Sequence, residues 1–305
     1  MLNRVSILHI PAISAIYYAL LQCGYEFFAV EKDESLTTTL EAFRTETAVF
    51  YDSYFSEIRQ STCDVYPYWP RAAALESACF FLDSMSSGFE HFDCYQEKIW
   101  SATNISPEEK GESFWRWIER FPAAINEVMK LASFQAYYAW ETKWIAQQNA
   151  LLQGALQQTQ EALERCAGAF GSGIQSVNIL LSPIKCAYSS DYHIVCDRLY
   201  FSSGMFQMES VVHEFLHPIM HPHIIGNRDA LLQYRGDYPD LDASYLLDGS
   251  EAGRLNAAEE YLVRALTHCA VRGMLPNNLR YFIQQSMAVL EHHYGMARAE
   301  TNGKP

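Results

Sequence analysis

The chain has 305 residues, of which 49% are hydrophobic and 14% aromatic, and this composition excludes an intrinsically disordered protein. A formal net charge of −14 at pH 7 argues against nucleic acid or an anionic membrane as a partner. The eight cysteines are scattered and form no C-x-x-C pair, which is typical of reduced thiols and predicts a cytoplasmic protein.

The N-terminal half reads almost entirely as helix, from residue 1 to about 168. We interpret the apolar run "ILHIPAISAIYYALLQC" as a buried amphipathic helix, because Arg4 is its only preceding basic residue and Gln22 stands where a signal peptide needs a small residue. The segment "SPEEK", from Ser106, predicts a helix start. One or two long helices then follow Ala123 and end at "GSG", Gly171 to Gly173.

The pattern changes after that glycine break. The segments "SVNILLS" and "YHIVCDRLYF" predict strands of a small antiparallel sheet, separated by a turn at "YSSD". A helix containing "VVHEFLH" follows, then an irregular loop from Pro218 to Gly253, then helices in "RLNAAEEYLVRALTHCAV" and "LRYFIQQSMAVLEHHY". We therefore expect a predominantly α-helical α+β fold, with a helical region over 1–170 and a metal-binding region over 171–305, or one continuous domain.

The segment "HEFLH" carries the most specific chemical signal. On a helix, His213 and His217 lie one turn apart on the same face, so both imidazoles can bind one ion. The pattern H-E-x-x-H predicts a Zn²⁺ site, with Glu214 as the general base that takes a proton from a metal-bound water. Pro218 lacks the amide that would bond to the Glu214 carbonyl, so the helix should kink or end there.

The third ligand has several candidates. His223 stands where the metzincin pattern places a histidine, but Met220 replaces the glycine that this pattern needs for its turn. The later helix offers Glu259 and Glu260. A helical wheel places Glu259 at the border of the apolar face and Glu260 opposite that face, so we predict Glu260 as the ligand and Glu259 as the alternative.

The segments "VVHEFLHPIMHP" and "EEYLVRAL" together resemble the gluzincins, zinc peptidases in which a glutamate on a later helix completes the metal site. They are also similar to a little-characterised bacterial zincin family of unknown function that carries H-E-F-x-H, a later proline and E-x-x-V-R-A. The matching positions are His213–His217, Pro222, Glu260, Val263, Arg264 and Ala265. The segments "ALLQCGYEFF" and "ILLSPI" also resemble that family, and the resemblance implies a zincin-like core.

The sequence thus leads to the hypothesis of a zinc-dependent peptidase acting on a peptide or protein substrate. The alternative is a zincin-fold binding or regulatory protein with little or no turnover. Peptidases of this kind need a donor for the oxyanion, and Tyr245 is our first choice, ahead of Tyr238, His221, His223 and His268. For Arg264 the sequence favours an ion pair with Glu260, four residues before it, over binding of a substrate carboxylate.

Overall fold

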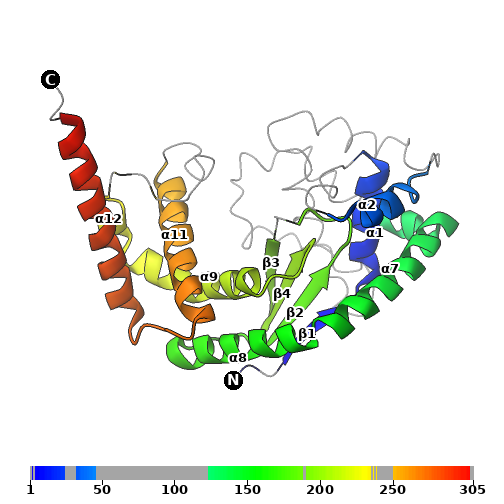
Figure 1. The fold of residues 1–305 in the computed structure, drawn as a ribbon, viewed down its shortest axis with the longest axis horizontal. Coiled ribbons are helices and arrows are strands. Elements are labelled where there is room, and N and C mark those ends of the chain that lie inside the picture. The colour runs from blue at the N-terminus through cyan, green and yellow to red at the C-terminus, as the bar shows by residue number, and fades with distance from the viewer. Residues whose placement is uncertain are drawn as a thin grey trace. The chain divides into compact units, whose positions relative to one another are not determined.

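The computed structural model describes residues 4–24, 32–45, 123–187, 190–234 and 250–302, together with positions 2, 236 and 238. These residues are mostly helical and include a four-stranded mixed sheet, which confirms the predominantly helical α+β class (Figure 1). The helix predicted at "SPEEK" lies outside the described residues.

The chain divides into two compact units that each combine separate segments. One unit contains residues 1–5, 154–176 and 207–305, and the other contains residues 6–153 and 177–206. The expected division after residue 170 stays a prediction, because residues 46–122 are outside the described part.

The core of the second unit is built around α1 (Pro11–Gln22). Pro11 occupies the first turn of this helix, where its missing amide costs no hydrogen bond. Every residue from Ile13 to Gln22 is buried, so the helix is enclosed on all sides and is not amphipathic as we had expected. It packs against α7 (Ala132–Leu151), where Tyr18 contacts the rings of Phe134 and Tyr137. The unit also contains α2 (Glu34–Glu41).

The sheet has the strand order β1-β2-β4-β3, with β1 (Arg4–Leu8), β2 (Ser176–Leu181), β3 (Ser190–Val195) and β4 (Arg198–Ser203). The prediction of a purely antiparallel sheet was wrong, because strand β1, which we had assigned to helix, joins it and the sheet is mixed. The segment "YHIVCDRLYF" is a hairpin and not one strand. Cys196, at φ 59°, makes the tight turn between β3 and β4, which pair antiparallel.

Two long helices precede β2, as predicted. They are α7 and α8 (Gln153–Phe170), and α8 ends where Gly171 adopts φ +78°. That left-handed conformation favours glycine, because a Cβ would be strained there.

The first unit contains α8 and the C-terminal helices α9 (Met208–Gly226), α10 (Arg228–Leu231), α11 (Glu251–Val271) and α12 (Leu279–Asn302). The expected irregular loop from Pro218 was wrong up to residue 231, because α9 continues through Pro218 and Pro222 and α10 follows. Helix α11 packs against α9, and Ile219, Met220 and Ile224 beyond the first proline are buried. We attribute the continuation to this packing, which offsets the hydrogen bonds that the prolines cannot make.

Within the described part of the chain, no helix combines the length and the apolar character that crossing a membrane requires.

A close backbone contact in the second unit generates a stability prediction. A Cβ at Gly204 would overlap the carbonyl oxygens of Lys185 and Cys186, and Lys32 Nζ donates to the Gly204 carbonyl at 3.0 Å. Gly204→Ala should therefore lower the free energy of unfolding by about 1–3 kcal/mol, the usual cost of overpacking. A Cβ at Gly168 would meet nothing within 4 Å. Gly168→Ala should therefore raise the free energy of unfolding by about 0.5–1 kcal/mol, because alanine favours the helical conformation more than glycine does. Urea denaturation measures both, and an unchanged midpoint for Gly204→Ala would contradict the packing described.

Candidate metal centre

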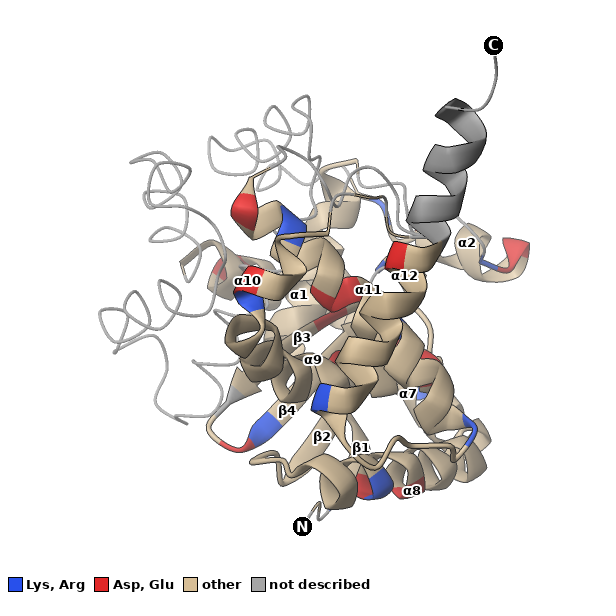
Figure 2. Ribbon diagram, turned by 90° about the vertical axis from the view of Figure 1, so that its left-hand side faces the viewer, with Lys and Arg blue, Asp and Glu red and all other residues tan. Residues whose placement is uncertain are grey.

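Helices α9 and α11 supply every residue of the candidate site, and both belong to the first unit. They make the most extensive contact of any two helices among the described residues, and Figure 1 shows α11 crossing α9. Helix α11 begins at a capped end, where the Ser250 hydroxyl accepts a hydrogen bond from the Gly253 amide at 3.0 Å. Figure 2 shows acidic residues in red on α11, and this helix contains Glu251, Glu259 and Glu260.

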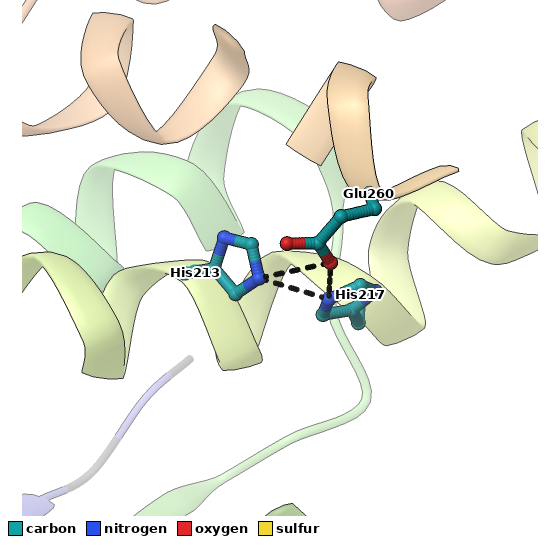
Figure 3. Close-up of side chains that lie close together, drawn as sticks. All are labelled: His213, His217 and Glu260. Atoms are coloured by element: carbon teal, nitrogen blue, oxygen red, sulfur yellow. Dashed lines mark hydrogen bonds and ion pairs between the residues drawn. The ribbon is translucent and has the colours of Figure 1, made fainter. Parts of the chain in front are cut away.

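His213, His217 and Glu260 come together in one group that could hold a metal ion. The two Nε2 atoms of the histidines are 3.1 Å apart. The Oε2 atom of Glu260 lies 3.4 Å from Nε2 of His213 and 3.5 Å from Nε2 of His217 (Figure 3). Glu260 is buried and the histidines are half-buried. Three potential ligand atoms therefore converge on one point.

Glu259 is buried as well, but its carboxylate faces the other side of His217. Its Oε1 atom lies 2.9 Å from Nδ1 of His217, and its Oε2 atom lies 2.8 Å from Nδ1 of His221. The His221 side chain is 58% exposed. Glu259 therefore connects a half-buried histidine of the group with an exposed one, and it does not belong to the group itself.

Arg264 holds the second oxygen of Glu260. Its Nε atom donates to Oε1 at 2.7 Å, which confirms the predicted pairing and leaves Oε2 directed at the histidines. Burial alone would raise the pKa of Glu260, but hydrogen bonds from His213 and His217, with the Arg264 guanidinium, hold it well below its usual range. The Glu260 carboxylate is therefore ionised across the physiological range.

His217 is surrounded by negative charge. Burial lowers its pKa, but hydrogen bonds to Glu259 and Glu260 and the charge of Glu214 outweigh burial and raise the pKa to about 9. The pKa of Glu259 is also lowered, because its hydrogen bonds with His217 and His221 outweigh the burial that would raise it. The charged groups near the two rings are the carboxylates of Glu214, Glu259 and Glu260 and the guanidinium of Arg264. When both imidazoles are neutral, these groups together carry a net charge of −2. A divalent cation would offset that excess.

The burial of α11 differs from what the helical wheel predicts. The wheel placed Glu260 away from the packed side of α11, but the structure buries both glutamates at 8% exposure. Successive helical residues are separated by 100°, so both can face a crossing helix while reaching different histidines. The sequence signal that we did not use was the position of His221, one turn after His217.

Further candidates were His223, Tyr245 and Tyr238. His223 lies on α9 outside it, which agrees with our choice against the metzincin pattern. Tyr245 lies outside the described residues. Tyr238 is buried, and its ring packs against Tyr234 and Tyr261.

Comparison of the chain with protein-family models, with curated proteins and with solved structures finds no match. The function must therefore be argued from the residues of the site.

The raised pKa of His217 generates a prediction for the metal-free protein. A histidine whose pKa is higher in the folded chain than in the unfolded chain stabilises the folded state. This stabilisation is fully present at pH values below the pKa of the unfolded chain, and it is lost as the pH rises through the pKa of the folded chain. We expect the free energy of unfolding to fall between pH 6.5 and about 9 as His217 loses its proton. Urea denaturation in the presence of a chelator measures this. His217→Gln should remove most of the decline, and an equal decline in both proteins would contradict the assignment.

Proposed function

We propose that the protein is a zinc-dependent hydrolase of peptide bonds, with His213, His217 and Glu260 as the zinc ligands. The observation that carries the proposal is the spacing of the three ligand atoms. Zinc bonds to nitrogen and oxygen are about 2.0–2.2 Å long, so neighbouring corners of a tetrahedral site lie about 3.3–3.6 Å apart. The separations of 3.1, 3.4 and 3.5 Å are close to those edges.

The donor set supports a catalytic and not a structural zinc. Structural sites close the tetrahedron with four protein ligands and are rich in cysteine, whereas catalytic sites use three protein ligands and keep one position for water or substrate. Two imidazoles and one carboxylate are such a set, and the group contains no fourth ligand among the described residues. The same donor set is expected of the gluzincins that the sequence resembles.

The residues around the group have separate roles in the proposed reaction. Bound zinc would supply a Lewis acid at this site, which lowers the pKa of a water molecule and polarises a carbonyl. Glu214 is next to His213 in the chain and close enough to affect the pKa of His217. It would serve as the general base that accepts a proton from water and returns it to the leaving amine. Arg264 keeps Glu260 ionised and directed at the histidines. We retain Tyr245 as the proposed donor to the oxyanion.

Metal analysis of single variants tests the ligand set. We expect about one zinc per chain in the purified protein, and His213→Ala and Glu260→Ala should each lose stoichiometric zinc because they remove a converging ligand atom. His223→Ala is the matched control on the same helix and should keep its zinc. Full occupancy in His213→Ala, or a loss confined to His223→Ala, would contradict the ligand set.

Glu214→Gln tests the hydrolytic step separately from metal binding. Glutamine keeps the shape and hydrogen bonding of the side chain but cannot accept the proton. Zinc content should therefore persist while cleavage of a peptide library falls by about 10²–10⁴-fold, the usual contribution of a general base. A chelator should abolish cleavage by the unmodified protein. If Glu214→Gln cleaves at the original rate, or if the zinc-loaded protein cleaves no peptide, the proposed activity is wrong.

A further inference from the structure

The carboxylate of Glu259 uses both of its oxygens on histidine rings. Oε1 is 2.9 Å from Nδ1 of His217, and Oε2 is 2.8 Å from Nδ1 of His221. The side chain is only 11% exposed, so this buried charge is compensated by the two ring nitrogens. Loss of either partner would leave a buried oxygen with one contact fewer.

The contact on His217 determines which nitrogen the ring presents to the group. A neutral imidazole carries its proton on one nitrogen and its lone pair on the other. A carboxylate beside Nδ1 can only accept, so Nδ1 must hold the proton and Nε2 must carry the lone pair. It is Nε2 that lies 3.1 Å from His213 and 3.5 Å from Glu260. Glu259 therefore favours the one tautomer of His217 in which Nε2 can bind a metal.

We propose that Glu259 is a positioning residue that fixes the tautomer and the ring orientation of His217, and that His221 holds Glu259 in place from the solvent side. The inference rests on the proposed function, because it assigns these residues a role toward bound zinc. Carboxylates that orient metal-binding histidines typically contribute 10–100-fold to metal affinity.

This assignment explains why α9 carries a third histidine at the same spacing and α11 an adjacent pair of glutamates. His213, His217 and His221 follow one another at intervals of four residues, so they lie along one side of α9. Glu260 faces the first two rings, and Glu259 faces the last two. The two glutamates thus have different roles, one as a ligand and the other as the support of a ligand.

The test compares zinc affinity across Glu259→Ala, Glu259→Gln and His221→Ala, by competition with a chromophoric chelator. Glu251→Gln is the matched control, because Glu251 is exposed on the same helix and pairs with Arg228 instead of a histidine of the site. We expect Glu259→Ala to bind zinc about 10–100-fold more weakly. Glu259→Gln should lose less, because its amide oxygen can still accept from Nδ1 of His217. His221→Ala should show a smaller loss than Glu259→Ala, and the control should be unchanged.

Nitrogen-15 NMR of the histidines in the zinc-loaded proteins gives a readout that a general loss of stability would not change. We expect a protonated, slowly exchanging Nδ1 on His217 in the unmodified protein and in Glu259→Gln, and faster exchange of this proton in Glu259→Ala. An unaltered Nδ1 signal in Glu259→Ala, or a zinc affinity within twofold of the original, would overturn the positioning role. If Glu259→Ala weakens zinc as expected but the unmodified protein cleaves no peptide, the positioning role stands and the peptidase function alone fails.

Discussion

Burial of the neighbouring carboxylates of Glu259 and Glu260 against helix α9 is the constraint on which the rest of the site depends. A buried carboxylate is costly unless it is paired and hydrogen-bonded. Each of these two has partners on both oxygens: Glu259 has His217 and His221, and Glu260 has Arg264 and the two histidines of the group. The histidines at one-turn intervals on α9 supply these partners where α11 packs against it, and the same packing brings Nε2 of His213 and His217 to Oε2 of Glu260.

The course of α9 past Pro218 is what places His221 beside Glu259. If α9 ended at Pro218, His221 would no longer lie one turn after His217, and Oε2 of Glu259 would lose its contact with the His221 ring. The helix instead continues to Gly226, with apolar residues buried on the far side of both prolines. Tertiary packing outweighs the local preference of proline here, and local preference was all that the sequence made visible.

The parts of the fold that could be predicted from the sequence are those with a strong local signal. The helix α8 ends before Gly171 as expected, because a glycine in the left-handed conformation ends a helix without information about the rest of the chain. The hairpin at Cys196 could not be predicted in the same way, since a non-glycine residue at positive φ gives no turn signal. In the site, H-E-x-x-H located two of the three converging residues by spacing alone, whereas the roles of Glu259 and Glu260 depend on the angle at which α11 crosses α9. One sequence does not encode that angle in any local pattern.

Diffraction from crystals of the zinc-loaded protein, with anomalous differences collected on both sides of the zinc absorption edge, tests the central claim most directly. We predict one strong anomalous peak bonded to Nε2 of His213, Nε2 of His217 and Oε2 of Glu260, at about 2.0–2.2 Å from each, with Glu259 still hydrogen-bonded to Nδ1 of His217. A peak bonded to His223 or to Glu259, or no peak at these three atoms, would contradict the account.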